Sequence, residues 1–355
     1  MSDMKKFPIE YLLDVTKRIF ASAGTPPADA GLVAKLIVQA NVRGLDSHGI
    51  IRIPQYVARI GEGRIVPGAP METVVETGST ALLNVNWNFG QLGAHRAATM
   101  AMEKARDHGV GCVGLHRSEH VGCLGLFTEM IARQGMIGLA MCSGAAPSGH
   151  WVAAWGGREG RMGTNPISFA APTSGDPILV DVATSTLSEG KVRYARDCGR
   201  KLPDQWVLDA DGRPTDDPGA LYGDPGDGDP GGAILPLGGL LGYKGFGFSM
   251  IAAVLSSLLM RAADHRMEQE SNNLWILAID VGAFMPPEEF RQDLEEYIAY
   301  VKSSQPAAGA EGVVLPGELD FAKQRACEKE GVPVPDEIWS QIEEVAGSLN
   351  VSLDE

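Results

Sequence analysis

The chain has 355 residues and a formal net charge of −15, from 30 Lys and Arg against 45 Asp and Glu. This balance argues against a nucleic-acid or anionic-membrane partner, because such surfaces require a positive field. Hydrophobic residues make up 44% and charged residues 21%, which excludes a disordered chain and indicates a folded protein.

The cysteines and the N-terminus bear on the compartment. Five cysteines are widely spaced, without a CxxC pair or a Cys/His cluster, which is typical of a reducing compartment and predicts no metal site. Residues 1–13 lack the apolar core of a signal peptide, and no run reaches about 18 consecutive apolar residues. We therefore expect a cytoplasmic protein without a membrane segment.

The pattern of the first 65 residues predicts helices. Apolar residues recur at three- and four-residue spacing from Pro8 to Ala23, and Gly24 ends this helix. The dipeptide Thr25-Pro26 is expected to cap and begin a second helix. A third, shorter helix is expected around residues 51–61.

From about residue 73, short β-rich runs alternate with amphipathic helices, which is the pattern of an α/β domain. The helix expected over Gly90–His108 ends at Gly109. A long apolar helix is expected inside this block, from Phe246 to Ala262. Strands are expected at residues 73–75, 81–83, 110–115, 137–141, 167–171, 178–182, 206–208 and 274–281.

The C-terminal part returns to helices. They are expected over residues 287–302, 317–330 and 335–349. Since a chain of this length is near the size limit of one core, we expect two domains. The first is a discontinuous helical domain of residues 1–72 and 285–355, and the second is a central α/β domain of residues 73–284.

Two glycine-rich segments are candidates for phosphate binding. Gly109–Gly114 matches G-x-G-x-x-G, but a dinucleotide motif follows a strand and opens a helix, whereas this one follows a helix and opens a strand. We interpret it as a helix C-terminus leading into a buried strand. Gly242–Gly247 runs into the apolar helix and carries Lys244, which suits an anion. The alternative is a plain helix entry with Lys244 in solvent.

The most chemically suggestive cluster is Asp46-Ser47-His48-Gly49, followed by Arg52. On a helical turn His48 and Arg52 point the same way, which places a proton carrier beside a bidentate cation. That pair suits a small carboxylate with an adjacent carbonyl or hydroxyl. Ser47 can orient or relay a proton, and Asp46 is expected to cap the turn. The alternative is a capping turn with a surface arginine.

Three further segments carry weaker signals. His120 lies between a strand and a helix, where α/β proteins place functional loops, and is a second proton-transfer candidate. Thr164 lies in a turn-rich segment and can bond a substrate, although an ordinary turn explains it equally. Asp181 begins Asp-Val-Ala-Thr-Ser at a strand end, which suits a ribose or an amide, or else a loop with satisfied hydrogen bonds.

Seven segments occur in an order and spacing that resemble the malate/L-lactate dehydrogenase family, which is distinct from the Rossmann-type lactate dehydrogenases. The resemblance extends from about Lys17 to Val351. The segments are GLDSHGIIR, HRSEHVGCLG, GGREGRMGTNPISFAAP, DVATSTLSEGK, LPDQWVLDADGRPTDDP, LGYKGFGFSM and LPGE.

The resemblance implies an NAD(P)-linked oxidoreductase with a non-Rossmann α/β cofactor domain, a helical domain from both termini, and a homodimer. It also implies that Ser47 and His48 form a proton relay, Arg52 anchors the substrate carboxylate, and Thr164 contacts the substrate. His120 matches the base of the ureidoglycolate branch. The implied cofactor contacts are His120, Val121, Gly122, Cys123, Leu124, Ser143, Asp181, Val182, Ala183, Lys244, Gly309, Ala310 and Glu311.

The expected reaction is hydride transfer between the nicotinamide of NAD or NADP and C2 of a small 2-oxo or 2-hydroxy acid, such as malate, lactate or sulfolactate. We favour His48 over His120 as the acid and base, because Arg52 on the same turn would fix the substrate beside it. Within the family the alternatives are a cyclic-imine carboxylate reductase and a ureidoglycolate-type dehydrogenase. The imine-reductase branch has Asp where this chain has Lys191, which weakens that hypothesis.

Two alternatives come from other classes. A hydrolase would use Ser47 as its nucleophile, but adjacent residues rarely point at each other productively and no G-x-S-x-G elbow is present. A protein that binds acids without catalysis would leave NAD(P)H unconsumed. The sequence leaves open the cofactor, the substrate and the stereochemistry.

Overall fold

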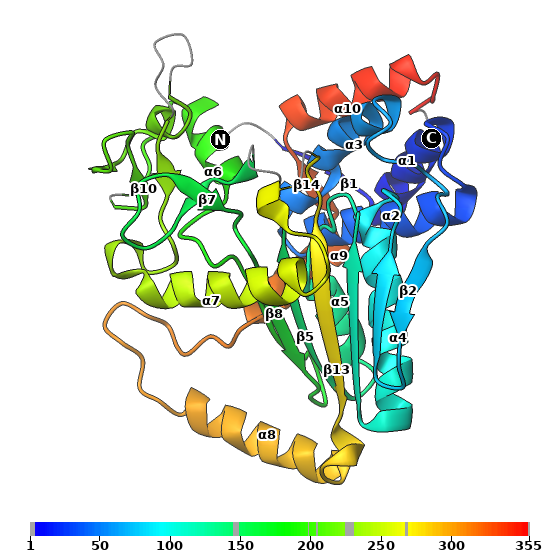
Figure 1. Ribbon diagram of the computed structural model, residues 1–355, viewed down its shortest axis with the longest axis vertical. Coiled ribbons are helices and arrows are strands. Elements are labelled where there is room, and N and C mark those ends of the chain that lie inside the picture. Colours follow the sequence, from blue (N-terminus) through cyan, green and yellow to red (C-terminus); the bar gives the residue numbers. More distant parts are fainter. Residues whose placement is uncertain are drawn as a thin grey trace.

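The protein is built around a seven-stranded mixed sheet (Figure 1). The computed structural model describes residues 4–144, 149–197, 199–203, 205–223, 231–266 and 269–353. Within this sheet, β3 (Thr80–Asn84) and β4 (Val110–His116) pair in parallel, and the other described neighbours pair antiparallel. In sheet order the strands are β2 (Glu72–Glu76), β3 (Thr80–Asn84), β4 (Val110–His116), β13 (Asn273–Asp280), β5 (Met136–Ser143), β8 (Ile167–Ala171) and β9 (Ile178–Val182). The predicted α/β class and these strands are confirmed, and the sheet is not the doubly wound parallel sheet of a Rossmann domain.

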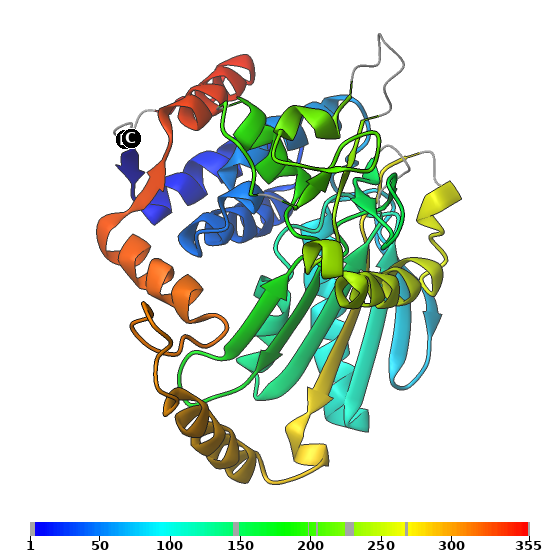
Figure 2. The same ribbon diagram turned by 90° about the vertical axis from the view of Figure 1, so that its left-hand side faces the viewer.

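Helices cover both faces of this sheet. The two helices α4 (Gly90–His108) and α5 (Gly125–Ala132) pack on one face, and α7 (Tyr243–Ala253) crosses the other (Figure 2). The glycines of β4 permit this close packing. A Cβ at Gly111 would lie 2.0 Å from the Ala101 carbonyl oxygen of α4. Gly109, at φ 77°, ends α4, so the interpretation of this motif as a helix end followed by a buried strand is confirmed.

The apolar helix predicted over Phe246–Ala262 differs in both bounds and geometry. α7 begins at Tyr243 and ends at Ala253, and a π-helical turn then spans Val254–Leu258. Within that turn the Ser256 hydroxyl donates to the Ala252 carbonyl oxygen at 2.6 Å. Serine hydroxyls that bond a preceding carbonyl compete with helical hydrogen bonds, which accounts for the change of geometry. The helix is also not buried all round, since one side of it is exposed.

Both ends of the chain contribute to a helical layer. Residues from both ends share one hydrophobic cluster, which includes Leu12, Phe20, Tyr56 and Ile342. Antiparallel pairing of β1 with β14 ties the two ends together. The elements are β1 (Lys5–Phe7), α1 (Ile9–Ser22), α2 (Pro27–Val42), α3 (Ile53–Gly61), α9 (Glu318–Glu330), β14 (Val332–Val334) and α10 (Asp336–Ser348). All five helices were expected from the sequence.

The predicted cap of the second helix is wrong. Pro26 is the N-cap of α2, it makes no side-chain cap bond, and Pro27 is the first helical residue. The Thr25 hydroxyl is buried without a hydrogen-bond partner among the described residues. Proline at the first helical position already has the helical φ and no N–H to satisfy, so this start does not depend on a side-chain cap.

A second, five-stranded sheet lies beside the first. Its hydrophobic cluster is separate and includes Val152, Val192, Val207 and Ile234. The strands, in sheet order, are β11 (Pro214–Thr215), β10 (Val207–Leu208), β12 (Ala233–Ile234), β6 (Val152–Ala153) and β7 (Gly160–Met162), and α6 (Glu189–Asp197) packs near them. The central block therefore contains two cores, and the domain boundaries at residues 72 and 285 remain a proposal.

One helix stands apart from both cores. α8 (Pro287–Lys302) has no buried residue and follows the end of β13 away from the sheet (Figure 1). A long loop then returns the chain to α9. No helix in the described part of the chain is long and apolar enough to cross a membrane.

Candidate active site

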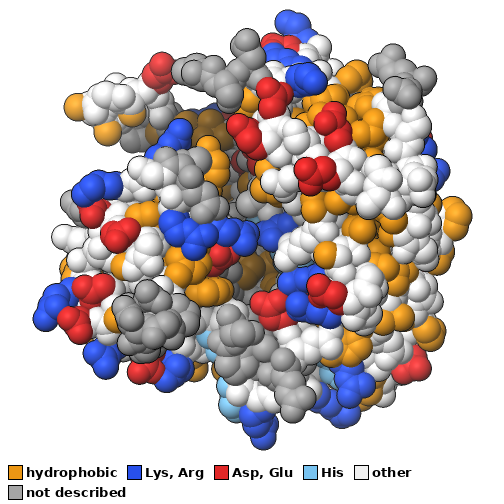
Figure 3. All heavy atoms as spheres, turned by 90° about the horizontal axis from the view of Figure 1, so that it is seen from above, with side chains coloured by type: hydrophobic (Ala, Val, Ile, Leu, Met, Phe, Trp, Pro, Cys, Tyr) orange, Lys and Arg blue, Asp and Glu red, His pale blue; other side chains and the backbone are white. Residues whose placement is uncertain are grey.

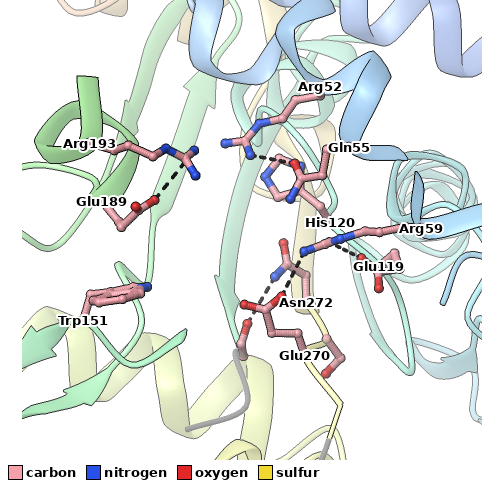
Figure 4. Close-up of a pocket in the computed structure, with 12 residues that line it drawn as sticks. Arg52, Gln55, Arg59, Glu119, His120, Trp151, Glu189, Arg193, Glu270 and Asn272 are labelled. Atoms are coloured by element: carbon pink, nitrogen blue, oxygen red, sulfur yellow. Dashed lines mark hydrogen bonds and ion pairs between the residues drawn. The ribbon is translucent and has the colours of Figure 1, made fainter. Parts of the chain in front are cut away.

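A cavity of about 320 Å³ opens between the helical layer, the loop after β4 and the second sheet (Figure 4). Arg52 and Arg59 line one wall, His120 lies at its back, and Glu189 and Arg193 face it from α6. In the space-filling view, Lys and Arg side chains gather along a hollow on this side of the molecule (Figure 3). The size suits a small ligand.

The segment that carries His48 and Arg52 is organised by one buried side chain. Asn41 donates from Nδ2 to Asp46 Oδ1 at 2.7 Å and accepts at Oδ1 from the Ile50 amide at 2.7 Å. A Cβ at Gly49 would lie 2.0 Å from Asn41 Oδ1, so a larger residue here would displace the Asn41 side chain and break its two hydrogen bonds. The chain therefore makes two consecutive 3-10 turns over residues 46–48 and 50–52, where we had expected one helical turn. Asp46 does not cap the turn, because its carboxylate is engaged by Asn41.

Ser47, His48 and Arg52 nevertheless lie together, as the pattern predicted. Ser47 Oγ is 3.0 Å from His48 Nδ1. Arg52 donates from Nε to the Ser47 carbonyl oxygen at 2.6 Å and from Nη1 to Gln55 Oε1 at 2.8 Å. Both partners of the guanidinium are neutral, so its charge remains available to an anion in the cavity.

His120 lies against His48. Their ring centroids are 5.4 Å apart and the rings are inclined by 22°. Tyr56 Oη is 2.5 Å from His120 Nδ1, and Gln91 Nε2 donates to the same hydroxyl at 2.9 Å. Because Tyr56 accepts from Gln91, its own proton is directed to His120 Nδ1, which favours the tautomer with the proton on Nε2. Both candidate histidines are thus parts of one site.

Both imidazoles are held neutral. Burial, together with the charges of Arg52 and Lys191, lowers the pKa of His48 from 6.5 to about 4. Burial, Arg52 and His48 itself lower the pKa of His120 well below 6.5. Burial raises the pKa of Tyr56 to about 12, so its hydroxyl keeps its proton. Neutral imidazoles at neutral pH are able to accept a proton from a substrate hydroxyl.

A cluster of charged side chains surrounds Arg59, which lines the same wall of the cavity as Arg52. Arg59 pairs with Glu119 and lies 2.9 Å from Glu270, and Arg64 Nη2 lies 3.1 Å from the same Glu270 oxygen. Burial raises the pKa of Glu119, which these arginines offset. Asn272 donates to the Gly144 carbonyl oxygen at 3.1 Å and accepts from the Val121 amide at 3.2 Å, and so holds the end of β5 beside the loop after β4. Arg59 is therefore neutralised by protein carboxylates, unlike Arg52.

Several residues implied as cofactor contacts lie together at the ends of β5 and β9. Asp181 accepts from the Gly125 amide at 2.7 Å and from Cys123 Sγ at 3.2 Å, and burial raises its pKa to about 6. Cys123 belongs to the loop of residues 121–124 that follows His120. Ser143 Oγ is buried without a partner among the described residues, and Val182 is 47% exposed. The two residues lie at the ends of strands that flank β8, and a buried hydroxyl without a partner is a candidate contact for a polar ligand.

The other predicted residues lie elsewhere. The Thr164 carbonyl oxygen accepts from the Thr184 amide at 3.0 Å, and Thr164 does not line the cavity. Lys244 lies in the first turn of α7, with Nζ 5.8 Å from the Tyr243 ring centroid. Residues 309–311 are exposed in the loop between α8 and α9. Their proposed contacts with substrate and cofactor remain predictions.

The sequence pattern missed several members of the site. Tyr56 lies on the apolar face of its helix and carries no local signal. Glu189, Arg193 and Glu270 come from distant segments that only the fold brings together. No group of three or more His, Cys, Asp or Glu within the described residues is placed to hold a metal ion.

Known proteins match this chain along most of its length. The model of the family described as malate/L-lactate dehydrogenase matches residues 7–343. The chain belongs to this family. It is 34% identical to a malate dehydrogenase of Pyrococcus abyssi, over 98% of this chain and 95% of the relative. It is also 34% identical to the NAD(+)-dependent ureidoglycolate dehydrogenase of Escherichia coli strain K12, over 95% of each chain.

The fold agrees with this assignment. The structure of malate dehydrogenase from Pyrococcus horikoshii OT3 superposes with a TM-score of 0.89 at 30% identity, over 99% of this chain and 97% of that one. The predicted family is confirmed, and the protein is an oxidoreductase, a dehydrogenase of this family. A hydrolase and a non-catalytic binding protein are thereby set aside.

Proposed function

We propose that the protein transfers a hydride between a nicotinamide cofactor and C2 of a small 2-oxo or 2-hydroxy acid. The observation that carries the proposal is the cluster of Ser47, His48, Arg52 and His120, in which Arg52 and His120 line the cavity and the other two residues contact them. It combines two neutral proton carriers with a guanidinium that has no carboxylate partner among the described residues. The names of the relatives, malate and ureidoglycolate dehydrogenases, agree with a small acid as substrate.

The bound cofactor would supply or accept the hydride, and the chain's own residues manage the substrate and its proton. Arg52 binds the C1 carboxylate through charge-assisted hydrogen bonds of about 1.5–3 kcal/mol each. During oxidation His48 Nε2 accepts the hydroxyl proton, and Ser47, at its Nδ1, orients the ring. His120 donates from Nε2 to the same oxygen. We assign the main acid and base to His48 because Nδ1 of His120 is tied to buried Tyr56.

We propose the cofactor site at the loop of residues 121–124, with Ser143 and the strand end at residues 181–183. The orphaned Ser143 hydroxyl and the exposed Val182 support this location. Lys244 and residues 309–311 are kept as predicted contacts, and NAD and NADP both remain candidates. An E. coli relative is named as NAD(+)-dependent.

A panel assay tests the function. Purified protein is incubated with NADH or NADPH and with oxaloacetate, pyruvate, 3-sulfopyruvate or piperideine-2-carboxylate, and the absorbance of the reduced cofactor is followed. We expect oxidation of at least one cofactor with a 2-oxo acid and little with the cyclic imine. Lys191 acts on His48 where the imine-reductase branch has Asp, which opposes a cationic substrate there. Turnover of the imine alone would contradict the proposal.

We also propose a homodimer in the cytoplasm. The exposed side of α7 carries Phe248 and Ile251, at 53% and 46% exposure, and Leu259 beyond it is 58% exposed. Contiguous apolar surface of this kind marks an interface. Sedimentation equilibrium is expected to give twice the 37.7 kDa chain mass, and Phe248→Asp to give the monomer mass. A wild-type monomer would contradict this.

The free described cysteines Cys112, Cys123, Cys142 and Cys327 support a reducing compartment, and Cys198 lies outside the described residues.

A further inference from the structure

Two guanidinium groups face each other across the cavity (Figure 4). Arg52 projects from the segment before α3, and Arg193 projects from α6 on the opposite wall. Among the described residues, Arg52 forms no ion pair, and its hydrogen-bond acceptors are a carbonyl and an amide oxygen. The cavity therefore places two positive charges on opposite walls with open space between them.

Arg193 is only loosely paired within the chain. Its Nη2 is 3.9 Å from Glu189 Oε2, one helical turn earlier on α6, and its side chain is 53% exposed. The other oxygen of Glu189 accepts a hydrogen bond from Tyr222 Oη at 2.9 Å. A partly exposed pair at this distance contributes little free energy, so an anionic ligand can replace Glu189 as the partner of Arg193 at low cost.

The other cations nearby are engaged or lie outside the cavity. Arg59 also lines it, but Glu119 and Glu270 neutralise that guanidinium. Lys191 acts on His48 but is not among the lining residues. Within the described part of the chain, Arg52, which has no ion pair, and Arg193, which is loosely paired, are the two lining cations whose charge a ligand can engage.

The charges of the two arginines act on each other. Burial lowers the pKa of Arg52, and the positive charges of Arg193 and Arg59 lower it further, whereas Tyr56 and Glu189 act in the opposite direction. Repulsion between like charges across a partly buried cavity is relieved when an anion lies between them. A ligand with one negative group would offset the charge of only one of the two arginines. A ligand with a negative group at each end would bind both Arg52 and Arg193.

We propose that Arg193 is a specificity-determining residue that binds a second acidic group of the substrate. The C1 carboxylate lies on Arg52, and a carboxylate or sulfonate at C3 lies on Arg193. The preferred substrate is then a dianionic 2-oxo or 2-hydroxy acid rather than a monocarboxylate such as pyruvate. This inference rests on the proposed function and names the substrate class of the same site.

The test compares kcat/KM for three substrates. Pyruvate carries no second acidic group, oxaloacetate carries a second carboxylate, and 3-sulfopyruvate carries a sulfonate. We expect the wild-type enzyme to prefer at least one dianion over pyruvate by about 100-fold. Arg193→Gln should lower kcat/KM for that dianion by about 10- to 100-fold, the worth of one charge-assisted contact, and change that for pyruvate by less than about threefold. Arg193→Lys should keep part of the preference because the charge remains.

Arg161→Gln is the matched control. Arg161 is an exposed arginine of β7, in the five-stranded sheet near which α6 packs, and it pairs with Glu159 and does not line the cavity. We expect no change with any of the three substrates. The inference is overturned if wild-type enzyme uses pyruvate as efficiently as both dianions, or if Arg193→Gln lowers all three equally. In either case a 2-oxo acid is still reduced and the proposed function stands, whereas failure to reduce any 2-oxo acid would overturn both.

Discussion

Replacing Arg52 by alanine is expected to lower kcat/KM for 2-oxo acids by about 10²- to 10⁴-fold, since two charge-assisted hydrogen bonds of about 1.5–3 kcal/mol each would be lost. The guanidinium is fixed by the Ser47 carbonyl oxygen and Gln55, and it forms no ion pair with a carboxylate among the described residues. Its loss removes the C1 carboxylate contact in both the ground state and the transition state. Steady-state kinetics with the preferred 2-oxo acid measure the effect.

Two further measurements make the Arg52 result specific. The Kd of the reduced cofactor, followed by its fluorescence, is expected to stay within about threefold, because the proposed cofactor site lies at the ends of β5 and β9. Arg52→Lys keeps the charge without the planar fork and should fall between wild type and Arg52→Ala. Arg18→Ala, at a partly exposed arginine of α1 that pairs with Asp14 and does not line the cavity, serves as the control. Unchanged kinetics in Arg52→Ala would remove this residue from the substrate site.

His48→Gln is expected to lower kcat by about 10²- to 10⁴-fold, the usual contribution of a general acid and base. Glutamine keeps a polar side chain of similar reach but does not titrate. Because the pKa of His48 is lowered to about 4, its imidazole is unprotonated and ready to accept a proton throughout the neutral range. For oxidation of the 2-hydroxy acid, wild-type kcat/KM should therefore stay level between about pH 6 and 8 and fall only at more acid pH.

The same assay distinguishes His48 from His120. His120→Gln should lower kcat less than His48→Gln does, if His120 only donates a hydrogen bond to the substrate oxygen. Tyr56→Phe removes the partner of His120 Nδ1 and should lower kcat by about 3- to 10-fold, the worth of one neutral hydrogen bond. A larger loss in His120→Gln than in His48→Gln would exchange the two roles. A decline of wild-type kcat/KM centred near pH 6.5 would contradict the lowered pKa of His48.

Local signals in the sequence were sufficient for most of the secondary structure. Helix ends follow from glycine and proline, and strands from β-branched runs, because these preferences act within a few residues. Gly109 was correctly interpreted as a helix end for this reason. The local signals failed where one particular side-chain hydrogen bond decides the geometry, even between residues four or five positions apart. Asn41 engages Asp46 instead of leaving it as a cap, and Ser256 lies within a π-helical turn.

Part of the candidate site was also predictable from local sequence, and the rest depends on contacts between distant segments. Ser47, His48 and Arg52 lie within six positions of one another, so their spacing alone indicated a proton carrier beside a cation, and the motifs indicated the family. The contact of Tyr56 with His120 spans 64 positions, and the pair of Arg59 with Glu119 spans 60. Arg193 faces Arg52 only because the second sheet and its helix pack beside the first. Spacing along the chain therefore predicts a site whose residues lie on one turn. Burial and distance, which only the folded structure sets, determine the tautomer of His120, the neutralisation of Arg59 and the opposing charge of Arg193.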